Sequence, residues 1–202
     1  MRAWRDAVWD AVPEDAVPDD FADRFAFLRA YVAAGDRLLD LGCGDGRFAA
    51  ALSALAGTVV AADVSGVALE RAALAAPGAQ IAELRDGEPL PFAGSAFDVV
   101  WAGETLEHVA DVTGLLGEAR RVLRPGGTLL VTTPNLARLR VAAEALAGGP
   151  LERRLDPRAD HLRFFTARTL AAVLGGAGFG DVTVRRAGGL PLLRRSLRAI
   201  AR

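Results

Sequence analysis

A glycine-rich turn between a hydrophobic strand and a helix carries the clearest chemical signal in this sequence. Residues 38–46 read LLDLGCGDG, so a leucine-rich run leads directly into Gly42, Gly44 and Gly46. Glycine allows a tight turn and a close approach of a ligand to the backbone, because it has no Cβ atom. The stretch therefore predicts a nucleotide-binding loop in which these three glycines face the ligand.

The spacing of this loop and a neighbouring acid indicate the kind of ligand. The dinucleotide fingerprint G-x-G-x-x-G requires glycine at position 47, but the chain has Arg47, and its third glycine comes one residue early. Asp40, two residues before the first glycine, would repel a pyrophosphate at close range and attract a cation. A nicotinamide dinucleotide is therefore disfavoured, and a ligand with a positive centre, such as a sulfonium, is favoured.

A second acid ends the next hydrophobic run. Asp63 closes the stretch TVVAAD, 21 residues after Gly42. In nucleotide-binding α/β folds, an acid at this place accepts hydrogen bonds from the hydroxyl groups of a ribose. Taken alone, Asp63 could instead cap the following helix. In combination with the glycine loop it predicts a ribose site, to which we assign Asp63 and the adjacent Val64.

The elements that must position these residues alternate along the chain. Residues 1–35 have apolar side chains at helical spacing, with a break at two prolines. From Asp36 onward, short leucine-rich or β-branched runs alternate with alanine-rich stretches. This alternation is typical of βαβ units, so we expect an α/β fold with a mainly parallel, doubly wound, Rossmann-like sheet between two helical layers.

Taken in order, the motifs resemble those of class I S-adenosylmethionine-dependent methyltransferases, of the small type similar to ubiquinone-biosynthesis methyltransferases. The resemblance runs from about Asp36 to Phe179, and four stretches carry it: LLDLGCGDGRF, AADVS, RDGEPLPFAGSAFDVVWAGETLEHV and LRPGGTLLVTTPN. It implies a sheet of seven strands, the last of them antiparallel. The C-terminal residues SLRAIAR fit that last strand, although a basic helix with Leu190, Leu193, Leu197 and Ile200 on one face is the alternative.

The resemblance also implies an organisation and further site residues. We expect one methyltransferase domain over residues 1–202, with a helical N-terminal lid over 1–35 and a cofactor-binding core over 36–147. Residues 148–202 would supply a substrate-side insertion, the last helix and the C-terminal strands. By resemblance, Asp86 lies near the adenine amino group with Gly87 beside it, and Glu104 lies at the methionine end of S-adenosylmethionine.

Two histidines are the candidate catalytic residues, because the pKa of an imidazole lies near neutrality. His108 follows the fourth expected strand, at the edge where open α/β sheets bind ligands, although it could instead hold the turn. His161 lies between the fifth strand and the last helix, and could instead only pair with Asp160. Arg163 is a further candidate, as a clamp for an anionic acceptor. Cys43 is expected to be a packing residue.

Composition limits the remaining possibilities. A formal net charge of −1 gives no general attraction to a nucleic acid, and a single cysteine excludes an internal disulfide framework and cysteine-based zinc clusters. We expect no metal site. The longest stretch without a charged residue, Phe48–Ala62, is too short to span a membrane, so we expect no stable membrane insertion and a cytoplasmic protein.

These observations predict an enzyme that transfers a methyl group to an oxygen, nitrogen or carbon atom of a small-molecule acceptor. The alternatives are a cofactor-binding regulator or partner protein without turnover and, less favoured by the loop, a nicotinamide-dependent oxidoreductase. Neither the acceptor nor the oligomeric state can be read from the sequence.

Overall fold

Seven strands form a single sheet, of which six run in one direction. The computed structural model describes residues 2–18, 20–148, 152, 156, 160–188 and 195–202. The strands are β1 (Arg37–Leu41), β2 (Thr58–Asp63), β3 (Gln80–Glu83), β4 (Phe97–Gly103), β5 (Leu123–Pro134), β6 (Val182–Ala187) and β7 (Ser196–Ala201). Their order in the sheet is β3-β2-β1-β4-β5-β7-β6, and β7 is antiparallel to both of its neighbours. The predicted seven-stranded α/β fold is confirmed.

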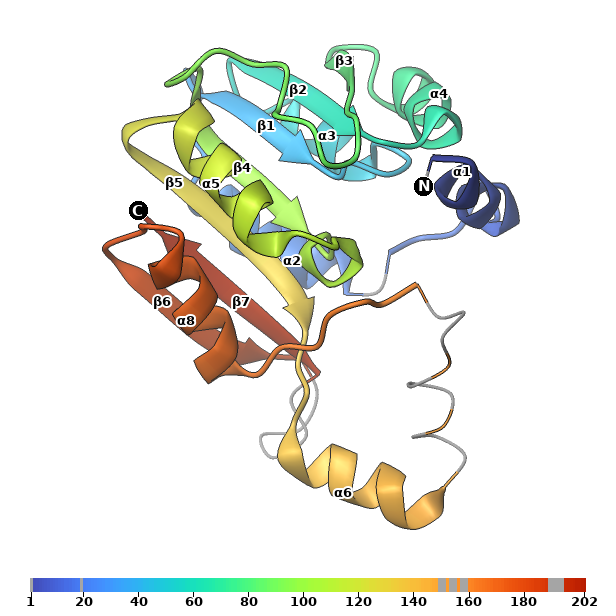
Figure 1. The fold of residues 1–202 in the computed structure, drawn as a ribbon. Helices are drawn as coiled ribbons and strands as arrows, with labels where there is room; N and C mark the ends of the chain where they lie inside the picture. Colours follow the sequence, from blue (N-terminus) through green and yellow to red (C-terminus); the bar gives the residue numbers. More distant parts are fainter. Residues whose placement is uncertain (1, 19, 149–151, 153–155, 157–159, 189–194) are drawn as a thin grey trace.

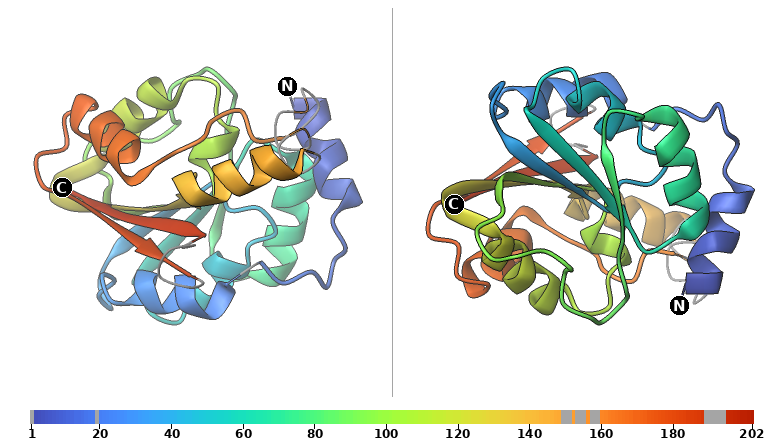
Figure 2. Two further views of the ribbon diagram at one scale, coloured as in Figure 1. Left: turned by 90° about the horizontal axis from the view of Figure 1, so that it is seen from below. Right: turned by 90° about the horizontal axis from the view of Figure 1, so that it is seen from above.

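Helices cover both faces of this sheet (Figures 1 and 2). The helical elements are α1 (Arg2–Ala11), α2 (Phe21–Arg29), α3 (Arg47–Leu52), α4 (Gly66–Ala75), the 3-10 turn η1 (Leu106–His108), α5 (Val112–Val122), α6 (Arg138–Ala147) and α8 (Ala167–Gly176). Helices α2, α3 and α4 pack on one face, and α5 and α8 pack on the other. The molecule therefore has three layers, with the sheet in the middle.

The alternation of side chains along the strands builds a core on each face. In β1, Leu38 joins the cluster under α2, α3 and α4, whereas Leu39 joins the cluster under α5 and α8. In β5, Leu130 belongs to the first of these clusters and Leu129 to the second. All four leucines are fully buried. Successive strand side chains point to opposite faces, so a sheet covered on both sides needs runs of consecutive apolar residues. The hydrophobic strand sequences meet this requirement.

The C-terminal residues form a strand. Residues 196–201 lie in β7, which pairs with β5 and with β6. The helical alternative for this segment is therefore wrong for Leu197 and Ile200, while positions 190 and 193 lie outside the described residues. The side chains of β7 alternate between half-buried and buried, because successive strand residues point to opposite faces of the sheet.

The two N-terminal helices have different surroundings. Helix α2 packs on the sheet, where Leu28 is fully buried and Phe27 lies near Trp101, with ring centroids 6.4 Å apart. Helix α1 instead lies beside α4, beyond the carboxyl ends of the strands (Figure 1). In the part of the chain that the structure describes, no helix is long and apolar enough to cross a membrane.

Candidate active site

A cavity of about 680 Å³ lies at the carboxyl ends of β1, β2, β3 and β4. The chain leaves β1 toward β2 and β3 and then returns to β4 on the other side of β1, so the cavity lies at the point where the strand order reverses. Its wall includes seven of the predicted site residues: Gly42, Asp63, Val64, Asp86, Gly87, Glu104 and His108. Among the described residues, Asp40, Gly44, Gly46 and His161 are not part of the wall.

The glycine loop adopts a conformation that only glycine accepts readily. Gly42, Gly44 and Gly46 all have positive φ, at 77°, 54° and 78°. Gly42 borders the cavity. The other two glycines permit packing, since a Cβ on Gly44 would lie 2.5 Å from the Trp9 ring and a Cβ on Gly46 would lie 2.7 Å from the Ala72 backbone. The loop is thus confined between α1 and α4.

Asp63 supports the loop and also borders the cavity. Its two carboxylate oxygens accept hydrogen bonds from the backbone N–H of Gly44, at 3.0 Å, and of Ser65, at 2.9 Å. The residue that caps α4 is Ser65, whose side chain accepts from the backbone N–H of Ala68. The alternative assignment of Asp63 as a helix cap is therefore wrong. Burial raises the pKa of Asp63, and the backbone hydrogen bonds oppose that shift.

Asp40 lies beneath the loop. Its side chain is 2% exposed, and its Oδ2 is buried without a hydrogen-bond partner among the described residues. Burial and the nearby charge of Asp63 raise the pKa of Asp40 to about 7, while Arg24 opposes the shift. The carboxylate of Asp40 does not itself border the cavity. An ionised Asp40 can therefore attract a cationic ligand only at a distance, without direct contact.

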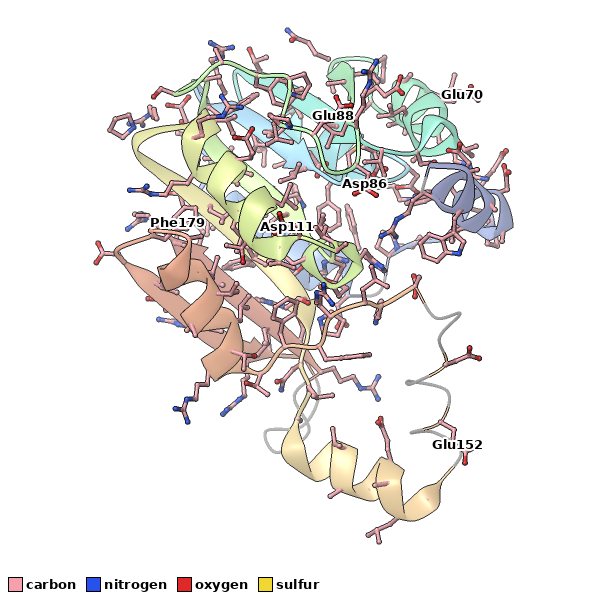
Figure 3. All side chains as sticks on the ribbon, in the orientation of Figure 1. Glu70, Asp86, Glu88, Asp111, Glu152 and Phe179 are labelled. Carbon is pink, nitrogen blue, oxygen red and sulfur yellow. The ribbon has the colours of Figure 1, made fainter. Side chains whose placement is uncertain are left out.

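The opposite wall comes from the segments that follow β3 and β4. Asp86 and Gly87 are exposed at the rim, and Figure 3 shows Asp86 on the side of the sheet where α1 lies. Glu104 follows β4 and has a positive φ of 55°, which a residue with a side chain adopts only under constraint from its surroundings. Its Oε1 is buried and has no hydrogen-bond partner among the described residues. The cavity therefore has an unsatisfied acceptor at Glu104.

The two histidines, far apart in sequence, are in contact. The rings of His108 and His161 meet edge to face with centroids 4.8 Å apart. His108 Nδ1 lies 3.0 Å from the carbonyl oxygen of Asp160 and 3.6 Å from its carboxylate Oδ2. Burial lowers the pKa of His108, so its imidazole is neutral at physiological pH. The sequence offered a pairing of His161 with Asp160 as the alternative to a catalytic role. In the structure, His108 makes such a contact with Asp160.

Glu107 was not anticipated as a site residue. Its side chain is 1% exposed, and its Oε2 accepts a hydrogen bond from Thr133 Oγ1 at 2.8 Å. Burial and the adjacent Glu104 raise the pKa of Glu107 to about 8, so in the absence of a cation this carboxyl group holds a proton at neutral pH. The spacing of Glu104, Glu107 and His108 within one short turn was the signal available in the sequence.

Arg24 was also missed, because the N-terminal helices were interpreted only as a lid. Its guanidinium lies over the rings of Phe48 and Trp101, 4.8 and 5.9 Å from their centroids. The residue is 7% exposed, and burial lowers its pKa against the attraction of Glu104, Glu107 and Asp40. Arg24 therefore supplies a buried positive charge that attracts the carboxyl groups of Glu104, Glu107 and Asp40.

Two other candidates have local roles. Arg163 is exposed and donates to the backbone carbonyl of Ala110, so in this structure its guanidinium binds protein rather than bordering the cavity. Cys43 is buried, and desolvation strongly raises the pKa of its thiol, which agrees with a packing role.

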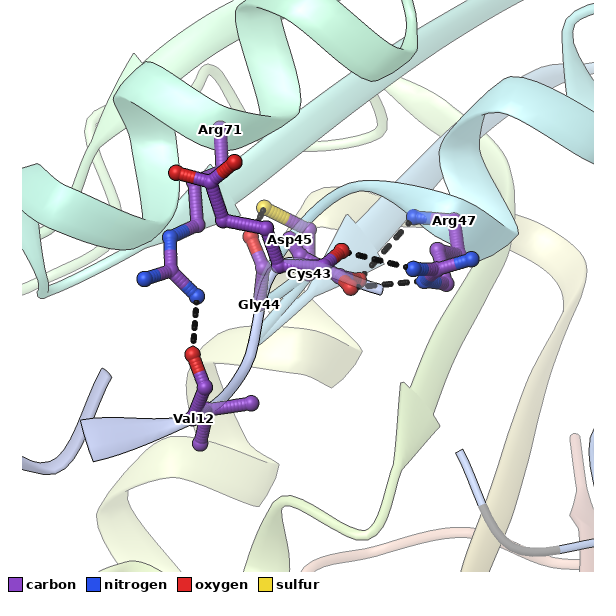
Figure 4. A network of polar contacts seen from close by, with 7 residues as sticks. Val12, Cys43, Gly44, Asp45, Arg47 and Arg71 are labelled. Atoms are coloured by element: carbon purple, nitrogen blue, oxygen red, sulfur yellow. Dashed lines mark hydrogen bonds and ion pairs between the residues drawn. The ribbon is translucent and has the colours of Figure 1, made fainter. Parts of the chain in front are cut away.

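Helix α1 and the segment after it cover the loop. Arg5 and Trp9 line the cavity, and Arg5 also donates to the backbone carbonyl of His108. Beyond α1, the guanidinium of Arg71 donates to the carbonyl of Val12 at 2.8 Å, next to the loop (Figure 4). Figure 4 also shows Arg47 paired with Asp45 of the loop.

Comparison with known proteins places these features in a family. A family model described as a methyltransferase domain matches residues 14–184. A ubiquinone biosynthesis O-methyltransferase of Mesorhizobium japonicum is 36% identical over 148 residues, which cover 71% of this chain and 59% of that protein. A 27-O-demethylrifamycin SV methyltransferase of Amycolatopsis mediterranei is 39% identical over 121 residues, covering 55% of this chain and 44% of that one. The chain thus spans about three fifths or less of these curated relatives.

Solved structures agree with the fold. An S-adenosylmethionine-dependent methyltransferase from Mesorhizobium loti superposes with a TM-score of 0.68 at 24% identity, covering 90% of this chain and 98% of that chain. At this identity the likeness concerns the fold alone. The family model, by contrast, matches most of the sequence, including the glycine loop and the strands whose carboxyl ends form the cavity. This chain belongs to the methyltransferase-domain family.

Proposed function

We propose that this chain transfers a methyl group from S-adenosylmethionine to a small-molecule acceptor. The observation that carries the proposal is the single cavity that combines Gly42, Asp63, Asp86 and Glu104 from four separate strand ends. Its volume of about 680 Å³ is within the range of pockets that hold small ligands. We infer from this size that the cavity receives both the cofactor and an acceptor.

The polar groups of the cavity fit this cofactor. The carboxylate of Asp63 accepts backbone hydrogen bonds from Gly44 and Ser65, and a carboxylate can accept about four hydrogen bonds in all, so capacity remains for ribose hydroxyl groups. The unpaired Oε1 of Glu104 suits the ammonium group at the methionine end of the cofactor. Asp86 and Gly87 at the rim suit the adenine edge, and Val64 would pack beside the nucleoside.

When bound, S-adenosylmethionine supplies a methyl group on a positively charged sulfur. The contribution of the protein is to align the acceptor and to exclude water. Trp9, Leu41 and Leu90 give the cavity apolar surface for this purpose. Because the imidazole of His108 is neutral and borders the cavity, it can accept a proton from the acceptor or orient it. We assign His161, which packs against His108, to the same catalytic group.

An oxygen atom is the favoured acceptor. The two relatives are named as an O-methyltransferase and as a methyltransferase of 27-O-demethylrifamycin SV, and both names specify a methyl group on oxygen. A hydroxyl group loses its proton during methylation, and His108 stands where such a proton could be received. We therefore propose a small molecule with a hydroxyl group as the acceptor.

Calorimetry with purified protein tests the cofactor assignment. We expect S-adenosylmethionine and S-adenosylhomocysteine both to bind, and Asp63→Ala to weaken each about 10- to 100-fold, since the ribose hydroxyl groups lose their acceptor in a buried site. Glu70→Ala, an exposed change on α4, should leave both affinities unaltered. Equal affinities in wild type and Asp63→Ala, or tighter binding of a nicotinamide dinucleotide, would contradict the proposal.

Turnover distinguishes an enzyme from a cofactor-binding partner protein. A metabolite extract incubated with protein and methyl-labelled S-adenosylmethionine should yield a labelled small molecule. The opposite result is that the cofactor binds but its labelled methyl group is not transferred to any compound, even in extracts that contain varied hydroxyl compounds. That result would support the non-catalytic alternative.

A further inference from the structure

Next to the cavity, three side chains with metal-binding atoms meet from two distant segments. Glu107 and His108 lie in η1, and His161 lies in the segment that precedes α8. One potential ligand atom from each residue lies within 4.8 Å of the other two. We propose that Glu107, His108 and His161 bind a divalent transition-metal ion of the zinc type at the acceptor side of the cavity.

The buried carboxyl group of Glu107 is an independent indication of a ligand. Oε2 accepts from Thr133, and Oε1 is buried with no donor among the described residues, while the neighbouring carboxyl group of Glu104 lies within hydrogen-bonding reach of Glu107. Two buried carboxyl groups side by side need either a shared proton or a cation to offset their repulsion, so this pair can accept a metal ion in place of a proton. With a side chain only 1% exposed, Glu107 has little access to water that could take this place.

The surroundings of His108 resemble those of a metal-binding histidine. A histidine ligand commonly donates its second ring N–H to a carbonyl or carboxylate, which orients the ring. His108 Nδ1 lies 3.0 Å from the carbonyl oxygen of Asp160, with the Asp160 carboxylate 3.6 Å away. A proton on Nδ1 leaves the lone pair of Nε2 free to bind a metal.

The two segments are held together without any metal. The backbone N–H groups of Leu162 and Arg163 both donate to the carbonyl of Glu107, at 2.7 and 3.0 Å. Metal–nitrogen bonds of about 2.0–2.1 Å require the ligand atoms of a tetrahedral site to lie roughly 3.4 Å apart. The three atoms lie within 4.8 Å of one another, so binding would draw the most widely separated pair together by up to about 1.4 Å. His161 is half-buried in a segment without regular secondary structure, so its side chain can make this adjustment.

The ligand types select the ion. Two imidazole nitrogens and one carboxylate oxygen suit Zn²⁺, Co²⁺ or Fe²⁺, whereas Mg²⁺ and Ca²⁺ prefer oxygen ligands throughout. Three protein ligands also leave a coordination position open, as in catalytic zinc sites. Because His108 borders the cavity, an acceptor hydroxyl group could fill this position and lose its proton to water more readily; with metal bound, the ion would replace the His108 imidazole as the group that promotes deprotonation. This role depends on the proposed methyl transfer, whereas the metal binding does not.

Metal binding by tag-free protein, without cofactor, tests the inference separately from activity. After treatment with a chelator, the protein should bind one equivalent of Zn²⁺ in competition with a chromophoric chelator. Co²⁺ should give visible absorption bands without a thiolate charge-transfer band, because Cys43 is buried and is not among the ligands. His161→Ala should weaken Zn²⁺ binding at least about 10-fold.

Two further variants make the experiment decisive. Glu107→Gln should weaken Zn²⁺ binding by a similar factor, and Glu70→Gln, exposed on α4, should leave it unchanged. Since Glu107 is buried, a thermal melt must show that its variant is folded, and His161→Ala carries the test if it is not. Absence of stoichiometric binding by the wild type, or equal affinity in wild type and His161→Ala, would overturn the metal site and leave the cofactor proposal intact.

Discussion

At the scale of single residues, the site contains several buried acids and few cations to pair with them. Asp40, Asp63 and Glu107 are all buried, and burial is the largest cause of the raised pKa of each. Arg24 is the buried cation whose charge acts on Asp40 and Glu107. Such an arrangement favours a positively charged ligand, because a bound cation lowers the free energy of the ionised acids.

The raised pKa of Asp40 predicts how stability depends on pH. A carboxyl group with a higher pKa in the folded than in the unfolded chain binds more protons when folded, so its ionisation favours unfolding. The stabilising contribution of protonated Asp40 is therefore complete below about pH 4. It is lost as the pH rises through about 7, where the folded chain also ionises Asp40. The shift from 3.8 to about 7 corresponds to roughly 4 kcal/mol at full ionisation.

Urea unfolding of the ligand-free protein between pH 5 and pH 8 measures this effect. The wild type should lose more stability over this range than Asp40→Asn, which cannot ionise. Glu70→Gln, exposed on α4, should follow the wild type. Parallel pH profiles for wild type and Asp40→Asn would show that Asp40 keeps an ordinary pKa.

At the scale of secondary-structure elements, α1 and α2 have separate roles although they are adjacent in sequence. Helix α1 makes one polar and one aromatic contact near the loop: Asp6 accepts from Ser65 Oγ at 2.7 Å, and the Trp9 ring covers Gly44. Helix α2 contributes apolar side chains to the core on one face of the sheet. We therefore propose that the lid expected from residues 1–35 consists of α1 alone, with α2 as part of the core.

Hydrogen exchange can distinguish these roles. We expect cofactor binding to slow amide exchange in α1 and in the Gly42 loop, because the ligand would fill the cavity that Arg5 and Trp9 border. Helix α2 serves as an internal control, and its exchange should change little since its packing does not involve the cavity. If the loop becomes protected while α1 does not, α1 is not a lid.

At the scale of the whole molecule, one sheet carries two cores. Leu129 and Leu130 are neighbours in β5, both are fully buried, and they belong to the cores on opposite faces. Because both side chains leave the same strand, disruption of either core disturbs the shared sheet. We propose on this basis that the methyltransferase domain unfolds as one cooperative unit.

Leucine-to-alanine variants at both positions test this proposal. Each should lower the unfolding free energy by about 2–5 kcal/mol, and each should retain a single transition. Tryptophan fluorescence, to which buried Trp101 contributes from one face, and far-UV circular dichroism, which reports helices on both faces, should give coincident curves. Two separate transitions, with each variant lowering only one, would mean that the faces unfold independently.

Local sequence patterns determined the strands, the glycine loop and the acids at the strand ends. A short leucine-rich run followed by glycines favours a strand and a turn, and parallel strands bring their carboxyl ends to one edge of the sheet. For this reason Gly42 and Asp63 could be assigned to one ligand site from the sequence, and the family resemblance added Glu104 to it. The presence of Asp40 beneath the loop followed from its position two residues before Gly42.

Only the tertiary structure decided which distant side chains meet. His161 reaches His108 because the segment before α8 binds the backbone of Glu107, and no local spacing encodes that contact. The burial of Arg24 and Glu107 likewise depends on which helix covers which part of the sheet. Periodicity specifies the face that an element buries but not the element it meets, because that partner is set by chain topology and long-range packing.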